Sequence, residues 1–383
     1  MNIQELLPVL FNITWQHLLM ICVGIVLIYL AIAKQYEPTL LLPMGFGAIL
    51  VNIPLTSAIT QIDPETGKAI EGALSVFYEA GIANEVFPLL IFIAIGAMID
   101  FGPLFKNPFL LLFGAAAQFG IFFTIIAATT MGFDLKEAAS IGIIGAADGP
   151  TSIFVSSRFA PDLLGPISVA AYSYMALVPI IQPPVIRLLT SKKERLIRME
   201  GHPKTVSRTA LILFPIIVTV IAGIVAPSSI ALIGFLMFGN LIRECGVLNK
   251  LSLSAQNELA SLVTILLGIS IASTMTAERF VRLDTLMIIG LGLIAFIFDT
   301  FGGVMFAKLV NVFRPEGKKI NPMIGACGIS AFPMSARVVH NMGQKEDQYN
   351  FLLMHAVSSN VGGQIGSVVA GGLILALVPL LLL

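Results

Sequence analysis

The sequence predicts an all-α polytopic membrane protein built from two inverted-topology repeats, each with a broken re-entrant hairpin. Three observations lead to this fold class. The 383 residues are 57% hydrophobic and only 11% charged, whereas soluble domains carry about 25% charged residues. Apolar runs of membrane-spanning length recur along the chain, and glycine and proline interrupt two further runs. The runs around these two interruptions follow the same order twice.

We predict ten membrane spans, because a helix that crosses a bilayer needs about 20 mostly apolar residues. No basic segment precedes the first span, so we expect a retained helix and no cleavable signal peptide. The predicted spans are 17–33, 38–54, 85–100, 109–132, 166–186, 209–226, 228–242, 258–276, 285–307 and 362–383.

Two apolar runs, 138–157 and 321–336, contain too much glycine and proline to form simple spans. Irregular backbone at membrane depth is tolerated only where protein or water covers it. We therefore expect re-entrant hairpins over 138–160 and 321–340. The run 348–361 leads from the second hairpin into the last span.

The two hairpins belong to an internal repeat. Segments 85–187 and 258–383 both read span, loop, span, loop, broken hairpin, span. The loop before the first hairpin is mainly acidic and the loop before the second is basic, so we expect opposite orientations in the membrane. Inverted repeats with broken helices are typical of transporters, with the site at the repeat interface. The predicted units are N-terminal scaffold helices 1–84, repeat 85–187, a cytoplasmic basic loop with connecting helices 188–257, and repeat 258–383.

Loop charge predicts the topology, because an excess of Lys and Arg in short loops marks the cytoplasm. Loops 187–208 and 308–319 are basic and loop 55–84 is acidic. We therefore place the two basic loops inside, the acidic loop outside and both termini outside, in a multi-pass protein of a bacterial or archaeal cytoplasmic membrane.

Composition also disfavours several function classes. The apolar composition predicts membrane lipid around the chain, and the formal net charge of zero makes nucleic acid an unexpected partner. Cys22, Cys245 and Cys327 have no CxxC spacing, so neither a disulfide framework nor a zinc site is expected. No GxxxxGK[ST], GxSxG or HExxH motif occurs, which argues against ATP binding through a P-loop.

The strongest candidate for a functional residue is Asp148, the only charge between Glu137 and Arg158. A carboxylate at membrane depth costs about 3 kcal/mol on insertion scales, so it indicates a functional site. Thr151 and Ser152 follow, and the neighbouring glycines and Pro150 free backbone carbonyls. Oxygen ligands suit a hard cation, so we expect a sodium or proton site. The alternative is a buried acid paired with an arginine such as Arg158.

The second hairpin offers further polar groups. Asn321 precedes a proline and could cap a helix, bind an ion, or do both. Ser330 supplies a hydroxyl, and Gly325 breaks the run. Arg337 could anchor the hairpin end at the headgroups or bind a carboxylate through two hydrogen bonds. In span 166–186, Tyr174 lies deep enough for its hydroxyl to have a functional role.

The strings 145–152, 172–184 and 321–337 resemble one family closely, the β subunits of sodium-translocating, biotin-dependent decarboxylases of oxaloacetate, methylmalonyl-CoA or glutaconyl-CoA. The resemblance implies that the chain decarboxylates carboxybiotin and exports sodium while consuming a proton. The residues it matches to sodium binding or to ion and proton handling are Asp148, Asn321, Gly325, Tyr174 and Ser330, and it assigns Arg337 to carboxybiotin.

The resemblance further implies a carboxyltransferase α subunit, a biotin carrier protein that supplies carboxybiotin, a small single-span γ or δ subunit and a homotrimer. It also implies an architecture like that of elevator-type sodium–carboxylate symporters. Together with our own candidates, Thr151 and Ser152, the expected sodium site contains Asp148 and Asn321 as its main ligands. The alternatives are a sodium-coupled carboxylate symporter, a cation/proton antiporter, or a scaffold subunit that holds a carboxylase at the membrane.

Overall fold

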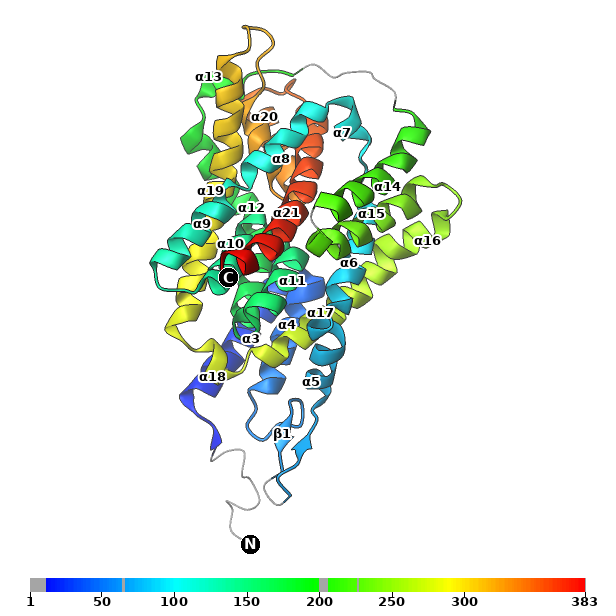
Figure 1. Ribbon diagram of the computed structural model, residues 1–383. Coiled ribbons are helices and arrows are strands. Elements are labelled where there is room, and N and C mark those ends of the chain that lie inside the picture. Colours follow the sequence, from blue (N-terminus) through cyan, green and yellow to red (C-terminus); the bar gives the residue numbers. More distant parts are fainter. Residues whose placement is uncertain (1–11, 64–65, 200–205, 226, 383) are drawn as a thin grey trace.

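The computed structural model describes residues 12–63, 66–199, 206–225 and 227–382. The predicted start of the chain (1–11), part of the basic loop (200–205) and the end of predicted span 209–226 therefore lie outside the described residues. Helices dominate, and the strands of the described part are β1 (Gln61–Ile62) and β2 (Ala69–Ile70), an antiparallel pair. The molecule is elongated, with β1 near one end and α13 near the other (Figure 1). We call the end with α13 the basic end and the end with β1 the opposite end.

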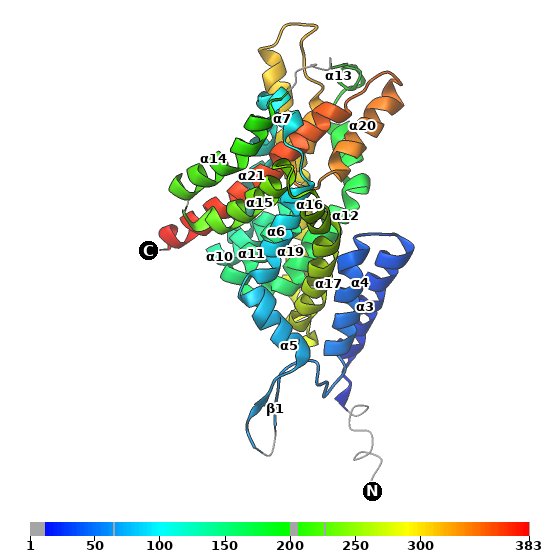
Figure 2. The ribbon, with the colours of Figure 1, turned by 90° about the vertical axis from the view of Figure 1, so that its right-hand side faces the viewer.

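One set of helices packs side by side from α3 to α14. α3 packs on α4, α4 on α17, α17 on α6, α6 on α15, and α15 on α14. Figure 2 shows α3 and α4 at one edge of the molecule, beside α17. We call this set the scaffold group. Its helices are α3 (Trp15–Ala33), α4 (Pro38–Val51), α5 (Ala73–Tyr78), α6 (Val86–Met98), α14 (Arg208–Val225), α15 (Ile230–Glu244), α16 (Asn249–Ser254) and α17 (Ala260–Ile271).

We call the remaining helices the hairpin group, because most of them surround the two broken segments; the short helix α18 packs on α3 instead. α19 packs on α9 and α12, while α21 packs on α8. The helices are α7 (Gly102–Lys106), α8 (Leu111–Ala117), α9 (Phe119–Thr130), α10 (Leu135–Gly142), α11 (Gly149–Phe159), α12 (Leu164–Leu189), α13 (Lys192–Arg195), α18 (Ala277–Phe280), α19 (Leu283–Val312), α20 (Met334–Glu346) and α21 (Leu353–Leu381). Two 3-10 segments, Ile143–Ala146 and Pro322–Gly328, belong to the broken hairpins.

In each predicted hairpin, the first and last residues lie close together, so the chain enters and leaves at the same end of the molecule. Glu137, near the start of the first, and Asp162, just past its end, line the same surface pocket. The second starts and ends beside Arg195, whose backbone oxygen accepts a hydrogen bond from Asn321 and whose guanidinium pairs with Glu346. Arg195 lies on α13, so the second hairpin enters from the basic end (Figure 1).

The prediction of ten spans is only partly matched. Within the described residues, six helices are long and apolar enough to cross a membrane, or seven if the pair Ala73–Ala83 and Val86–Met98, bent by 58°, counts as one span. The other predicted spans form shorter helices, such as α4 with 14 residues and α15 with 15. A helix of 14 residues measures about 21 Å, less than the ~30 Å hydrocarbon core. The fold is therefore an all-α multi-pass membrane protein.

The predicted start of the last span at 362 is wrong. α21 begins at Leu353 and runs for 29 residues, so it includes Ser358, Ser359 and Asn360. These polar side chains are buried, and the Asn360 amide donates a hydrogen bond to the Ile329 carbonyl. Their low hydropathy predicts a loop before the span. In the fold these side chains lie inside a helix, where contacts with other protein groups replace contacts with water.

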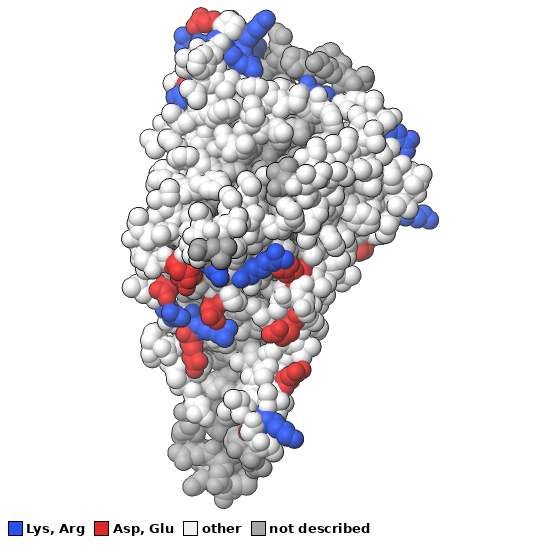
Figure 3. Space-filling model, viewed as in Figure 1, with Lys and Arg blue, Asp and Glu red and all other residues white. Residues whose placement is uncertain are grey.

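The surface agrees with membrane insertion. Over α9 and α21, Figure 3 shows a broad belt without Lys, Arg, Asp or Glu. This belt separates the charges at the basic end from a band of mixed charges nearer the opposite end (Figure 3). Large exposed apolar side chains include Ile126 on α9 and Leu377 on α21. Such a belt is the expected lipid-facing surface of a polytopic protein.

Candidate functional site

The first hairpin places Asp148 at a helix start deep in the molecule. A capping box of Asp134 and Glu137 starts α10, which continues into a 3-10 turn. Ala147 then adopts a left-handed conformation with φ of 51°, and the chain reverses. Asp148 is the N-cap of α11, and Pro150 lies in its first turn. The carboxylate therefore lies at the positive end of the α11 dipole.

The break of the second hairpin meets the break of the first. The 3-10 segment Pro322–Gly328 ends at Ile329, and a short irregular stretch leads to α20. Within that stretch, the Ser330 backbone N–H donates to the Ala146 carbonyl at 2.9 Å. This bond joins positions more than 180 residues apart. The free backbone groups of one break thus satisfy those of the other, as buried irregular backbone requires.

Three hydroxyl groups surround one oxygen of Asp148. Its Oδ2 accepts hydrogen bonds from Thr151 Oγ1 at 2.7 Å, Ser367 Oγ at 2.7 Å and Ser330 Oγ at 3.2 Å. Asp148 is only 2% exposed. Both hairpins and α21 contribute to this cluster, which we call the Asp148 cluster. The predicted candidate Ser152 lies beside it, but its hydroxyl donates to the Asp148 backbone carbonyl at 2.8 Å instead.

No basic side chain of the described residues pairs with Asp148, so the alternative of a buried Asp148–arginine pair is wrong. Arg158 instead forms an ion pair with Glu85, the N-cap of α6, and lies 4.7 Å from the Phe154 ring centroid. The hydroxyl groups stabilise the carboxylate without neutralising its charge. A buried acid with oxygen neighbours and no cationic side chain beside it is suited to receive a cation.

A pocket of about 200 Å³ opens beside the Asp148 cluster, between the hairpin group and the scaffold group. Tyr172 of α12 lines it, next to Gly149. A Cβ at position 149 would lie 2.1 Å from the Tyr172 ring, so only glycine allows this approach. Residues from both groups line the pocket, including Glu37, Ala94, Asp148, Ser330 and Gln364.

The structure does not bring Tyr174 to the Asp148 cluster. Its hydroxyl donates to the Ile289 carbonyl of α19 at 2.5 Å. Residues two apart on a helix differ by about 200° in direction, so Tyr172 and Tyr174 face opposite sides of α12. Tyr174 and Ser330, both matched to ion and proton handling by the resemblance, therefore do not share one cluster in the structure. Tyr172 is the tyrosine that lies beside Asp148.

Asn321 and Gly325 also lie apart from Asp148, which corrects the expected ligand set. The Asn321 amide donates to the backbone carbonyls of Arg195 and Ile197, both at 2.9 Å, and its oxygen accepts from the Met323 N–H. Asn321 thus caps the 3-10 segment and fixes the loop after α13. Gly325 packs against α19, where an added Cβ would lie 2.0 Å from the Gly303 carbonyl oxygen.

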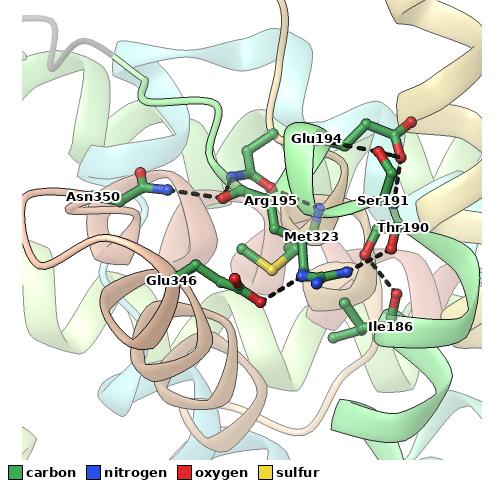
Figure 4. A network of polar contacts seen from close by, with 9 residues as sticks. Ile186, Thr190, Ser191, Glu194, Arg195, Met323, Glu346 and Asn350 are labelled. Carbon is green, nitrogen blue, oxygen red and sulfur yellow. Dashed lines mark hydrogen bonds and ion pairs between the residues drawn. The ribbon is translucent and has the colours of Figure 1, made fainter.

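A polar network at the basic end holds this loop to the second hairpin (Figure 4). The Arg195 guanidinium donates to Glu346 at 2.7 Å and to the Thr190 carbonyl at 2.5 Å. The Arg195 carbonyl accepts from the Asn350 amide at 3.0 Å, in addition to Asn321. The network fixes both ends of the second hairpin relative to α12, on which α20 also packs.

Arg337 lies on the exposed side of α20. Its guanidinium makes no ion pair or hydrogen bond with the described residues, whereas Val338 and Val339 beside it are buried. An unpaired arginine on the hairpin that carries Ser330 remains available for an anionic partner.

Sequence reasoning missed Ser367, Tyr172, Gln364 and Glu37. A signal for the α21 residues does exist, since Asn360, Gln364 and Ser367 repeat at intervals of four and three. This spacing places all three on one face of a helix, which is a polar face in an otherwise apolar span. Within the described residues, no group of three or more His, Cys, Asp or Glu could hold a metal ion. The site therefore rests on one carboxylate and neutral oxygens.

The fold and the Asp148 cluster define a class, the ion-translocating polytopic membrane proteins, in which a buried acid sits where broken helices meet. The chain belongs to a family within this class, described as "Na+-transporting oxaloacetate decarboxylase beta subunit", whose sequence model matches residues 16–378. It is therefore the membrane subunit of a sodium-pumping decarboxylase.

Several relatives named for different substrates match nearly the whole chain. The glutaconyl-CoA decarboxylase subunit beta of Acidaminococcus fermentans is 52% identical over 95% of this chain and 94% of its own length. The methylmalonyl-CoA decarboxylase subunit beta of Propionigenium modestum is 48% identical over 96% of both chains. The oxaloacetate decarboxylase beta chain of Klebsiella pneumoniae is 45% identical over 93% of this chain and 94% of its own length.

Proposed function

We propose that the Asp148 cluster is the binding site of the transported sodium ion. The observation that carries this proposal is the buried, unpaired carboxylate with three hydroxyl oxygens at the point where both hairpin breaks meet. One negative charge balances one monovalent cation, and hard cations take oxygen ligands. The hydroxyl groups of Thr151, Ser330 and Ser367 would rotate to point lone pairs at the ion, and the Ser152 hydroxyl would hold the Asp148 backbone in place.

We further propose that the chain decarboxylates carboxybiotin, delivered on a partner's biotin carrier protein. In this reaction the N–C bond to the carboxylate breaks, carbon dioxide leaves, and the biotin nitrogen takes up one proton. Arg337 has a free guanidinium on α20 and would bind the carboxylate through two hydrogen bonds. The second hairpin joins Arg337 to Ser330, so carboxylate binding and sodium binding act on one segment.

Sodium and proton movement are coupled, in this proposal, by exchange at the Asp148 cluster. An arriving sodium ion displaces the proton shared by Asp148 and its hydroxyl partners, and this proton is consumed at the biotin nitrogen.

Tyr174 and Asn321 support the site from a distance, Tyr174 through α19 and Asn321 through the loop after α13. Gly325 allows the close approach of the second hairpin to α19.

Two inverted repeats, 85–187 and 258–383, with scaffold helices 1–84 and connecting segment 188–257, form the proposed architecture. Packing between helices supports it. The last helix of each repeat packs on a helix of the other repeat, α12 on α19 and α21 on α8. Within each repeat, the helix of the hairpin packs on the last helix, α11 on α12 and α20 on α21. The hairpins enter from opposite ends, with the basic end in the cytoplasm. We propose that the hairpin group moves against the scaffold group, as in an elevator-type transporter.

The proposed assembly contains a carboxyltransferase α subunit, the biotin carrier protein, a single-span γ or δ subunit and three copies of this chain, in a bacterial or archaeal cytoplasmic membrane. Its support is membership of a β-subunit family, since a β subunit works with partner subunits. The carboxylated carrier would approach Arg337 from the basic end. Avidin, which sequesters biotin, should therefore block sodium uptake into inverted vesicles, whereas a symporter or antiporter would continue to work.

The decisive variant is Asp148→Asn in the assembled complex. It keeps the side-chain volume but removes the charge, so sodium uptake and sodium-dependent decarboxylation should fall below detection. The complex should still elute as one assembly in size-exclusion chromatography, because the carboxylate pairs with no basic group. Retention of sodium-dependent turnover in this variant would refute the proposed site.

A further inference from the structure

Glu37 occupies an unusual turn between α3 and α4. It is the N-cap of α4 with φ of 36°, in the left-handed region, yet its side chain makes no capping hydrogen bond. Residues other than glycine are strained in this region, and such strain collects at functional sites. Pro38 follows, so the first helical position has no N–H to cap. The Glu37 carboxylate makes no hydrogen bond or ion pair with any residue that the structure describes.

This carboxylate lines the same pocket as Asp148. Glu37 and Thr39, from the scaffold group, form one side, while Asp148 and Ser330, from the hairpin group, form another. Gln364 points independently to a ligand site: it is 3% exposed, it lines the pocket, and its amide has no hydrogen-bond partner among the described residues. A volume of about 200 Å³ corresponds to roughly six waters, enough for a partly hydrated ion.

The charges around the pocket favour a cation. Burial raises the pKa of the Glu37 carboxyl, because no charged neighbour of the described residues stabilises its ionised form, and a cation in the pocket would supply that stabilisation. Among the described residues, no Lys, Arg or His lines the pocket. Two carboxylates that face one poorly solvated pocket concentrate cations and repel anions. A monovalent cation at Glu37 would also find the free amide oxygen of Gln364 within the same pocket.

We propose that Glu37 is a second sodium-binding residue, which holds the ion on the scaffold side of the pocket before it reaches Asp148. This inference rests on the proposed function, and it adds an access site built from both groups of helices. Glu37 attracts the ion, Gln364 replaces part of its hydration shell, and the Asp148 cluster takes over the remaining ligands. Movement of the hairpin group would then separate Asp148 from Glu37 and close the path back.

Sodium activation of the purified complex tests this proposal. Glu37→Gln should raise the sodium concentration for half-maximal decarboxylation about five-fold, the effect of one unit charge across a partly solvated pocket. Glu37→Gly removes the same carboxylate and relieves the left-handed strain, so it should fold and show the same shift. Glu37→Asp keeps the charge and should stay within about two-fold of the wild type. Glu316→Gln is the matched control, because that side chain is 88% exposed in the loop after α19.

The outcomes separate this proposal from the proposed function. Unchanged sodium activation in both Glu37→Gln and Glu37→Gly would overturn the role of Glu37, even if Asp148→Asn is inactive. A shift of the same size in Glu316→Gln would overturn it too, since any lost charge would then suffice. If Asp148→Asn retains sodium-dependent turnover, the proposed function itself fails.

Discussion

Ser367→Ala is the sharpest test of the Asp148 cluster, because it removes a single hydroxyl group. In the structure this hydroxyl donates to Asp148 Oδ2 at 2.7 Å and also contacts the Gln364 carbonyl at 3.0 Å. A hydrogen bond to a charged group contributes about 1.5–3 kcal/mol. If the same oxygen becomes a sodium ligand, a loss of about 1.5 kcal/mol lowers sodium affinity roughly ten-fold. The backbone of α21 has no reason to move, since serine and alanine differ by one oxygen.

The assay is sodium-dependent decarboxylation by the purified complex, with sodium uptake into proteoliposomes as a second readout. Ser358→Ala is the matched control: it is a buried serine of the same helix, 3% exposed, whose hydroxyl donates to Met354 within α21. Ser367→Ala should raise the half-activating sodium concentration, and Ser358→Ala should not. Equal curves for the two variants would refute the assignment of Ser367 to the ion site.

Two further predictions concern the hairpins. Gly149→Ala would place a methyl group 2.1 Å from the Tyr172 ring. We expect the free energy of unfolding, measured by thermal unfolding, to fall by about 1–3 kcal/mol. Gly290→Ala is the control, because position 290 has open space around it, and it should not destabilise α19. The second prediction concerns pH. The hydrogen bond from Arg198 holds the pKa of Asp347 below the ordinary 3.8. The Asp347 carboxylate therefore stabilises the fold at neutral pH, and this stabilisation is lost as the pH falls below 3.8 and through the lowered pKa. The protection of the backbone amides after α20 against hydrogen exchange, taken relative to their intrinsic exchange rates, should therefore fall in acid in the wild type but not in Asp347→Asn, and equal protection in the two would contradict the prediction.

The position of Asp148 explains how a buried acid is tolerated without a basic partner. The N-terminal end of α11 and the hydroxyl groups of Thr151, Ser330 and Ser367 all place positive partial charge around it. These groups are neutral, so their stabilisation is weaker than that of an arginine. The carboxylate can therefore be neutralised by a proton or by a mobile cation, whereas an arginine partner would already have neutralised it.

The network around Arg195 fixes both chain ends of the second hairpin, while the tip of the hairpin lies deep in the molecule. The chain ends are tied by Glu346 and Asn321 to the segment after α12. The tip, around Ser330, contacts the first hairpin through one backbone bond and one side-chain bond. A segment held at one end transmits a displacement there to the other end. Binding of an anionic group at Arg337, between the two, would act on both.

Local patterns predicted much of this fold because they depend on neighbouring residues. The glycines and Pro150 around Asp148 allow only a broken helix, and the structure has its chain reversal there. The apolar run 285–307 is likewise found inside the 30-residue helix α19. The unpartnered acid also stood out, since a single charge in a long apolar stretch is visible in the sequence alone.

Sequence by itself thus determined the class of protein, the two breaks and the central acid, because each follows from local composition and from the high energy of a charge in lipid. Only the tertiary structure decided the partners of that acid. Ser330 and Ser367 lie 182 and 219 positions away, and the choice of Tyr172 over Tyr174 depends on which side of α12 faces the hairpin. Such contacts depend on how helices distant in sequence pack, which no local pattern of residues encodes.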